Sequence, residues 1–156
     1  MKVISAASEI PSMTKEEVEG FLESKLNLQL ATIDGQGNPN IQPVWFYYDK
    51  EGEKLWVNTS KSAKKTQNIG KRSTIYFSID DENPPYRGVK GLGTATIIEE
   101  PEIVFPQGDR ISLKYLGTLD HPIAKMISDE SKKGKVVLIE ISPKFFSTWD
   151  YGKLRF

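Results

Sequence analysis

The fold is decided above all by residues 55–69, L-W-V-N-T-S-K-S-A-K-K-T-Q-N-I. Apolar and polar residues first alternate as in a strand, and a group of hydroxyl side chains follows. The stretch then has the pattern of a short helix with Lys64 and Lys65 in its first turn. The free N–H groups at a helix N-terminus carry partial positive charge, so lysines are normally unfavourable there. A bound anion would remove the conflict, because N–H groups, ammonium groups and the hydroxyls of Thr59 and Ser60 would converge on it. The stretch therefore predicts a phosphate-binding helix start, with a solvated basic helix as the alternative.

Length and composition indicate a single globular domain, residues 1–156. The formal net charge is zero, which disfavours a dedicated nucleic-acid binder with a broad basic face. The chain has no cysteine, so disulfides, thiolate catalysis and cysteine-held metal clusters are excluded. Its start has too short an apolar run for a signal peptide, and no stretch could span a bilayer. We therefore expect a cytoplasmic protein that binds neither membrane nor nucleic acid.

Turn signals and alternating runs predict mainly β-structure. Residues 14–17, T-K-E-E, form a capping box that predicts a helix to about residue 24 or 25. Tight turns at 34–39 and 49–53 join the first three expected strands into an antiparallel meander. The expected strands are residues 28–33, 41–48, 54–59, 73–80, 86–98, 135–141 and 144–151, and further helices are expected around 111–116 and 122–131.

Proline and glycine within the expected strands indicate a curved sheet. Pro43 removes one hydrogen-bond donor from the second strand, which indicates an edge, a bulge or a site. Gly88, Gly91 and Gly93 interrupt the long strand at 86–98, which indicates a bend or a close backbone approach, as in a closed or partly closed barrel. We therefore expect an α+β, mainly β domain centred on a six- to seven-stranded β-barrel.

Aromatic side chains gather on the second expected strand. Alternation places Trp45 and Tyr47 on one face of this strand and Phe46 and Tyr48 on the other. Aromatic residues on both faces indicate that both are covered, one by the barrel core and the other by a ligand or a subunit. For Phe46, and for Trp56 on the neighbouring strand, core packing is the simpler interpretation.

Motifs for hydrolytic, metal and dinucleotide chemistry are missing. His121 is the only histidine, so we expect no metal site and interpret it as a turn or helix-start residue before Pro122. The sequence has no G-x-S-x-G elbow, so hydrolase chemistry is not expected. The G-L-G at residues 91–93 lacks the third glycine of a dinucleotide fingerprint, and a strand continues after it. No residue is identified as a catalytic acid or base.

Together, these motifs resemble those of the pyridoxamine 5′-phosphate oxidase-like, FMN-binding family of antiparallel split β-barrels with flanking helices. In this family a G-x-P turn, here residues 37–39, leads into a strand along the flavin ring, here residues 42–47. A small polar pair and a basic pair for the FMN phosphate follow, and a tryptophan near the C-terminus touches the flavin. The resemblance implies that the cofactor is bound by Gln42, Pro43, Val44, Trp45, Asn58, Thr59, Ser60, Lys64, Lys65 and Trp149.

The resemblance also implies a homodimer with FMN at its interface and a small-molecule substrate. The expected activity is that of a flavin-dependent oxidoreductase, which moves a hydride or electron pair to or from a small organic or redox partner. The vitamin B6 oxidases of the family carry an arginine and a lysine where this chain has Gln42 and Tyr47. This chain also ends K-L-R-F, residues 153–156, without their R-L-H-D-R-like segment. Pyridoxamine phosphate oxidase activity itself is therefore not expected.

Three alternatives stay open. A protein of the same fold that uses the deazaflavin F420 would need an extended basic groove for the long acidic tail of that cofactor. A non-catalytic flavin-binding or storage module would bind FMN tightly without turnover. A small barrel that stacks single-stranded nucleic acid on exposed aromatic side chains is the third alternative, and the zero net charge disfavours it.

Overall fold

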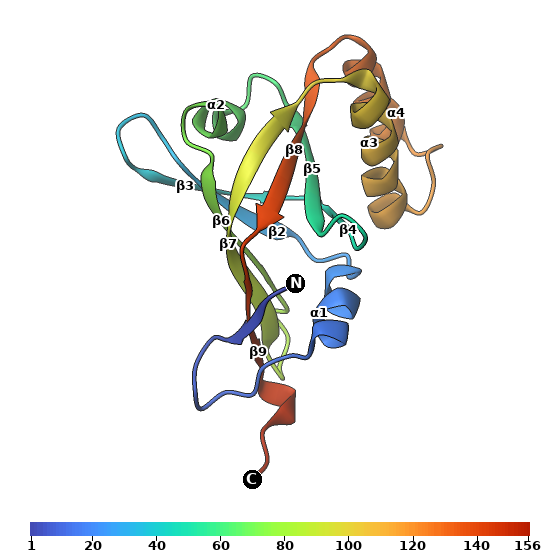
Figure 1. The fold of residues 1–156 in the computed structure, drawn as a ribbon. Helices are drawn as coiled ribbons and strands as arrows, with labels where there is room; N and C mark the ends of the chain where they lie inside the picture. The colour runs from blue at the N-terminus through green and yellow to red at the C-terminus, as the bar shows by residue number, and fades with distance from the viewer.

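A nine-stranded sheet with four α-helices around it makes up the fold, and the structure, a computed structural model, describes all residues, 1–156 (Figure 1). The strands are β1 (Val3–Ser5), β2 (Leu28–Ile33), β3 (Pro39–Val44), β4 (Tyr47–Asp49), β5 (Lys54–Ser60), β6 (Thr74–Asp80), β7 (Arg87–Ile98), β8 (Val136–Pro143) and β9 (Phe146–Asp150). The helices are α1 (Lys15–Leu22), α2 (Lys64–Lys71), α3 (Pro101–Leu116) and α4 (Pro122–Lys132), and a 3₁₀ turn, η1 (Tyr151–Lys153), follows β9.

The sheet closes on itself through one interrupted strand. Its order is β3-β2-β6-β7-β8-β5-β4, and every neighbouring pair in this order is antiparallel. β3 and β4 belong to one chain segment that is interrupted only at Trp45 and Phe46, so the two ends of the order are joined covalently. The strand expected at 41–48 is thus two strands, because the segment leaves β2 after Val44 and pairs with β5 from Tyr47.

The barrel is split where β3 and β5 diverge. β8 pairs with nearly the whole of β5, whereas β4 pairs only with its first part, from Lys54 to Trp56. The rest of β5 and all of β3 therefore each have one edge without a strand partner. Figure 1 shows the two strands running apart from β4, with α2 above them. The expected α+β, mainly β split barrel is confirmed, and the strand count rises to nine because the 41–48 strand divides and β1 pairs with β9.

Two hydrophobic clusters hold the helices to the sheet. The larger fills the barrel and includes the fully buried side chains of Phe46 and Phe77. The smaller lies on the outer side of β5 and β8, beneath α3, and consists of Trp56, Val104, Ile111 and Leu138. Figure 1 shows α3 and α4 side by side next to these two strands. One outer face of the barrel is therefore covered by the α3–α4 pair.

α3 is longer than the sequence predicts. A helix is expected around 111–116, whereas α3 begins at Pro101 and contains Pro106 and Gly108. Both residues lower helix propensity, but packing of one helix face against β5 and β8 outweighs that cost. α4 agrees closely with its expected range, and His121 is its N-cap, as expected, since Nδ1 accepts a backbone hydrogen bond at 3.1 Å.

β7 contains glycine where other segments approach it closely. A Cβ atom at Gly91 would lie 2.3 Å from the carbonyl oxygen of Phe145. A Cβ atom at Gly88 would lie 2.4 Å from the ring of Trp149. Real Cβ contacts are never this short, so the close backbone approach expected for this strand is confirmed.

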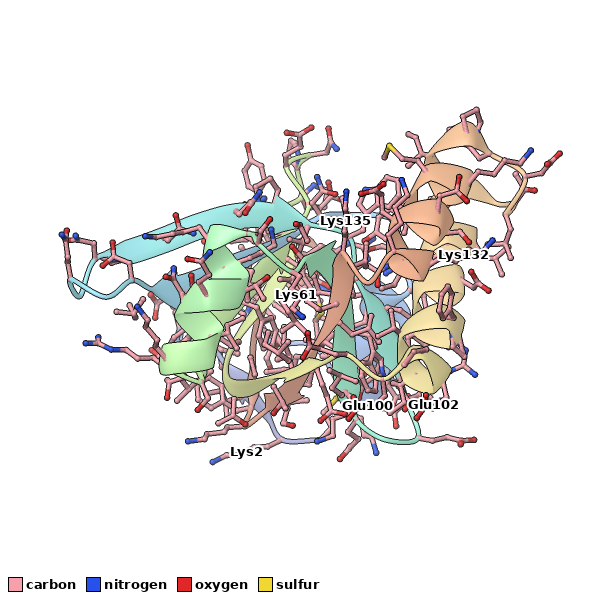
Figure 2. The ribbon with its side chains drawn as sticks, turned by 90° about the horizontal axis from the view of Figure 1, so that it is seen from above. Lys2, Lys61, Glu100, Glu102, Lys132 and Lys135 are labelled. Atoms are coloured by element: carbon pink, nitrogen blue, oxygen red, sulfur yellow. The ribbon has the colours of Figure 1, made fainter.

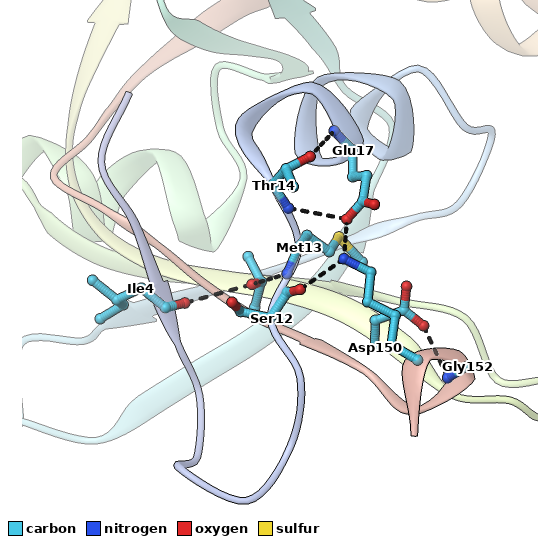
Figure 3. A network of polar contacts seen from close by, with 9 residues as sticks. Ile4, Ser12, Met13, Thr14, Glu17, Asp150 and Gly152 are labelled. Carbon is cyan, nitrogen blue, oxygen red and sulfur yellow. Dashed lines mark hydrogen bonds and ion pairs between the residues drawn. The ribbon is translucent and has the colours of Figure 1, made fainter. Parts of the chain in front are cut away.

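The end of the barrel opposite α2 is tied together by polar contacts (Figure 3). The expected capping box is present: the Glu17 N–H donates to Thr14 Oγ1 at 3.2 Å, and the Thr14 N–H donates to the Glu17 carboxylate at 3.0 Å. The Lys153 ammonium pairs with the same carboxylate and donates to the Ser12 carbonyl at 2.9 Å. These bonds hold η1 and the end of β9, which carries Trp149, against the start of α1.

Candidate functional site

The N-terminus of α2 presents unpaired backbone amides. Its N-cap is Ala63, whose side chain cannot cap the helix. The N–H groups of Lys64, Lys65 and Thr66 donate to no group of the protein. The turn before them is held by Ser60, whose carbonyl accepts from the Thr66 hydroxyl at 2.7 Å and from the Ala63 N–H at 3.1 Å. The helix start is therefore fixed in place with its first donors free.

The side chain of Lys65 is buried without a counter-charge. The residue is 5% exposed, and its ammonium donates to the side-chain oxygen of Gln42 at 2.9 Å. None of the ion pairs of the protein includes Lys65. Burial lowers the pKa of Lys65, because the ammonium loses hydration and gains no carboxylate. A buried charge in this state is unfavourable, and an anion between α2 and β3 would compensate it.

Four of the predicted cofactor residues lie around this helix start, and two of them, Gln42 and Lys65, are in direct contact. Lys64 and Lys65 come from α2, Ser60 from the end of β5, and Gln42 from β3 on the other side of the split. Lys64, Ser60 and Gln42 are exposed, whereas Thr59 is buried one residue before Ser60. We call Gln42, Ser60, Lys64 and Lys65 the α2 site. It has cationic groups, hydroxyl and amide donors, and no carboxylate, a combination that suits an oxyanion.

β3 continues from the α2 site as an edge strand. Pro43 is exposed, Val44 is buried and Trp45 is half-buried. An edge strand has backbone N–H and C=O groups without ladder partners. Pro43 lies on an edge, as expected, and removes one of these donors. The edge offers the polar rim of a planar ligand a row of backbone bonding groups.

Asn58 lies apart from the α2 site, beneath α3. A Cβ atom at Gly108 of α3 would lie 3.0 Å from Asn58 Nδ2. Both polar atoms of the Asn58 amide are buried without a hydrogen-bond partner, as is Nε1 of Trp56 two residues earlier. The alternation of β5 explains this placement, because Trp56 and Asn58 face α3 whereas Val57 faces the barrel interior.

Trp149 lies at the other end of the barrel. It pairs with Gly88 at the start of β7, whereas α2 leads into β6 at Thr74, which pairs with Thr94. Gly88 and Thr94 are separated along β7 by about 20 Å, at about 3.3 Å per residue. Within one chain, Trp149 is therefore not part of the α2 site.

α3 covers the aromatic face that the sequence assigns to a ligand or a subunit. The ring of Trp45 stacks on Tyr115 of α3, with centroids 4.7 Å apart and 4° between the planes, and Arg110 lies 5.8 Å from the Tyr47 ring. The expectation that a ligand or a subunit covers this face is therefore wrong, because α3, a helix distant in sequence, packs there. Phe46 and Tyr48, which alternate with Trp45 and Tyr47 along the chain, lie in the barrel core. Trp56 packs in the smaller cluster beneath α3, as expected.

A cleft opens between the α2 site and α4. Its volume is about 680 Å³, with Ser60, Lys61 and Ser62 on one side and Met126, Ile127 and Lys135 on the other. Figure 2 shows Lys61 and Lys135 between α2 and α4. Lys61 pairs with Glu99 at 2.7 Å, and Lys135 lies 3.8 Å from Glu130. The cleft shares Ser60 with the α2 site and reaches Met126 and Ile127 of α4, and no pattern in the sequence indicates it.

Two other kinds of feature are absent from the structure. No group of three or more histidine, aspartate or glutamate side chains could hold a metal ion. No helix is both long and apolar enough to cross a membrane.

The fold and the α2 site define a class of protein: a split β-barrel in which a helix start with free amides and a buried lysine opens at the split. The profile of the family described as pyridoxamine 5′-phosphate oxidase matches residues 14–150, most of the chain. The chain belongs to this family. No curated protein matches its sequence.

Solved structures share the fold. A conserved hypothetical protein from Mycobacterium tuberculosis is 24% identical, with a TM-score of 0.80, over 96% of this chain and 94% of that one. An F420 reductase is 29% identical, with a TM-score of 0.65, over 83% and 94%. A heme storage protein from Vibrio cholerae is 19% identical, with a TM-score of 0.66, over 83% and 89%. Because two of these names refer to different ligands, F420 and heme, the ligand must be argued from the site rather than from the fold.

Proposed function

We propose that this protein is a flavin-binding oxidoreductase whose cofactor phosphate occupies the α2 site. The observation that carries the proposal is Lys65, a buried ammonium whose hydrogen-bond partner is the neutral amide of Gln42. A phosphate dianion would supply the missing counter-charge and accept hydrogen bonds from the free amides of α2. FMN carries such a phosphate, and membership of the pyridoxamine 5′-phosphate oxidase family supports this cofactor.

The proposed roles follow the positions of the residues. Lys64 and Lys65 neutralise the phosphate, and Ser60 donates a hydroxyl hydrogen bond to it. The backbone of residues 43–45 bonds the polar edge of the ring. The bound flavin supplies the chemistry, which is the transfer of a hydride or an electron pair to or from a small organic or redox partner. The protein contributes binding and orientation, and turnover with such a partner distinguishes an enzyme from a flavin-storage module.

A comparison of FMN with riboflavin tests the proposed phosphate site. Lys65→Ala should weaken FMN binding about 30- to 100-fold, the equivalent of about 2–3 kcal/mol for lost charge-assisted hydrogen bonds, and leave riboflavin binding nearly unchanged. Lys71→Ala, at the other end of the same helix, is the matched control and should have little effect on either. Equal loss of FMN and riboflavin in Lys65→Ala, or no loss, would contradict the assignment. Titration calorimetry or flavin fluorescence gives the affinities.

The second part of the proposal is a homodimer with the cofactor at its interface. Ile41 of β3 and Tyr76 of β6 are 67% and 45% exposed, and both pair with Ala31 of β2 between them. Adjacent exposed apolar side chains on a sheet are typical of an interaction surface. The proposed dimer assigns Trp149 of the partner subunit to the cofactor, because Trp149 of the same chain lies at the opposite end of the barrel. Ile41→Asp should then give a monomer, as measured by analytical ultracentrifugation, and this monomer should bind flavin more weakly than the wild type.

The cleft of about 680 Å³ supports F420 as a second candidate cofactor. It begins at Ser60 and Ser62, beside the α2 site, and Lys61 and Lys135 lie along it. A cofactor that continues beyond its phosphate as an acidic chain could extend into this cleft. If F420 is the cofactor, its affinity should rise with the number of glutamates in its tail, and Lys135→Ala should reduce that dependence. FMN binding tighter than F420, with no effect of Lys135→Ala, would leave FMN as the cofactor.

A further inference from the structure

The last turn of α3 holds the interruption between β3 and β4. The Phe46 N–H donates to the Tyr115 hydroxyl at 3.3 Å, and the Phe46 carbonyl accepts from the Lys114 ammonium at 3.0 Å. The ring of the preceding residue, Trp45, stacks on Tyr115. Two adjacent helix residues therefore fix the point at which the edge strand passes from β2 to β5. We call Lys114 and Tyr115 the α3 clamp.

The α3 clamp is also bonded to a third part of the chain. Lys114 donates to the carbonyl of Leu22, the last residue of α1, at 3.1 Å. The Tyr115 hydroxyl donates to the carbonyl of Leu26, in the link from α1 to β2, at 2.8 Å. The clamp thus joins three segments that are far apart in sequence, and the interruption at Phe46 cannot move without breaking these bonds.

Lys114 is an unusual residue for this position. Its ammonium lies 3.5 Å from the centroid of the Phe46 ring, and none of the ion pairs of the protein includes it. Burial lowers the pKa of Lys114 to about 7, and Glu23 opposes the shift. A neutral amine keeps two N–H donors, one for each carbonyl, so the clamp can form in both protonation states. The titratable groups that line the adjoining cavity of about 250 Å³ are Glu23, Tyr47, Tyr48, Lys50 and Lys114 itself.

An apolar residue would avoid the desolvation of an amine, but it would leave the carbonyls of Leu22 and Phe46 without this donor. The lysine therefore holds the end of α1 and the interruption at Phe46 together through one side chain. The edge that it fixes is the one to which the flavin ring is assigned above. We propose that Lys114 and Tyr115 are positioning residues that set the path of the ring-binding edge from Pro43 to Phe46. This proposal rests on the proposed flavin function, and it predicts that the clamp acts on the ring and not on the phosphate.

Riboflavin and FMN affinities separate the α3 clamp from the α2 site. Lys114→Met keeps an unbranched side chain but removes its hydrogen-bond donors. It should weaken the binding of riboflavin and of FMN by the same factor, about 10-fold. Lys114→Arg should restore both, because a guanidinium can donate to both carbonyls and the adjoining cavity gives it room. Lys125→Met, which removes an exposed lysine of α4, is the matched control and should bind both flavins like the wild type. Riboflavin affinity in Lys114→Met equal to that of the wild type would overturn the proposal.

Hydrogen exchange of the Phe46 amide tests the clamp without any cofactor. In Tyr115→Phe, which removes the acceptor of this N–H, exchange should accelerate at least about 10-fold while amides of β8 keep their protection. Unchanged protection at Phe46 would overturn the clamp. If the wild type binds neither riboflavin nor FMN, the proposed function fails. Unchanged Phe46 exchange with intact flavin binding instead means that only the clamp fails.

Discussion

Lys65, which is buried, and Lys114, which is half-buried, both lie outside any ion pair, but their surroundings differ. The ammonium of Lys114 has two carbonyl acceptors and an aromatic ring, so its bonds are complete within the chain. The ammonium of Lys65 has one neutral acceptor, and free helix amides lie beside it. A buried cation therefore indicates a ligand only where neighbouring polar groups are also unsatisfied. On this criterion Lys65 supports the proposed anion site, whereas Lys114 is satisfied by groups of the protein itself.

Charge reversal at Lys65 should have the largest effect on flavin affinity. Lys65→Glu places a carboxylate where we propose a phosphate, so FMN affinity should fall more than about 100-fold while riboflavin affinity changes much less. Lys71→Glu at the far end of α2 controls for the change in net charge. Comparable FMN affinity in Lys65→Glu and Lys71→Glu would contradict the assignment of the phosphate to Lys65.

The pH dependence of stability should reveal Lys114. Its pKa is about 7 in the folded chain against an ordinary value of 10.5, so between these values the unfolded chain binds more protons. The free energy of unfolding should therefore rise with pH above about 7, by about 1–2 kcal/mol after allowance for partial solvation. Denaturant titrations at pH 6.5 and 9.5 measure the rise, which should be smaller in Lys114→Met. An identical rise in both proteins would show that Lys114 is not the group responsible.

Without ligand, removal of the lysine charge should change the free energy of unfolding in opposite directions at Lys65 and Lys114. Lys65→Met should leave the apo protein as stable as the wild type or more stable by about 0.5–1 kcal/mol, because an uncompensated charge is removed. Lys114→Met should be destabilising by about 1 kcal/mol or more, because two carbonyls lose their donor. Thermal unfolding of the two variants, each without flavin, gives both values. A loss of stability in Lys65→Met would indicate that Lys65 is structural.

The sequence predicts the parts of this fold that depend on local patterns. The capping box at Thr14, the helix that begins at Lys64 and the edge position of Pro43 all follow from residue types a few positions apart, and the structure confirms them. The division of the 41–48 strand and the early start of α3 at Pro101 do not follow from such patterns. Both depend on packing between segments that are distant in sequence, and this packing overrides propensity.

The candidate site divides in the same way. Lys64 and Lys65 are identified by a local violation of helix electrostatics, which a sequence can display. Tyr115 and Lys114 carry no such signal, because their partners at Phe46 and Leu22 are far away along the chain. The burial of Asn58 beneath Gly108 likewise depends on where α3 packs. The sequence therefore displays the residues of the proposed phosphate end, but it does not display the residues that hold the proposed ring-binding edge.

The most direct test is the pKa of Lys65 measured by NMR with and without FMN. In the free protein, burial should hold the pKa of Lys65 below its ordinary value. A phosphate dianion beside the ammonium favours its charged form, so FMN should raise this pKa while riboflavin should not. An identical pKa for Lys65 in the free and FMN-bound protein would contradict the phosphate assignment at the α2 site.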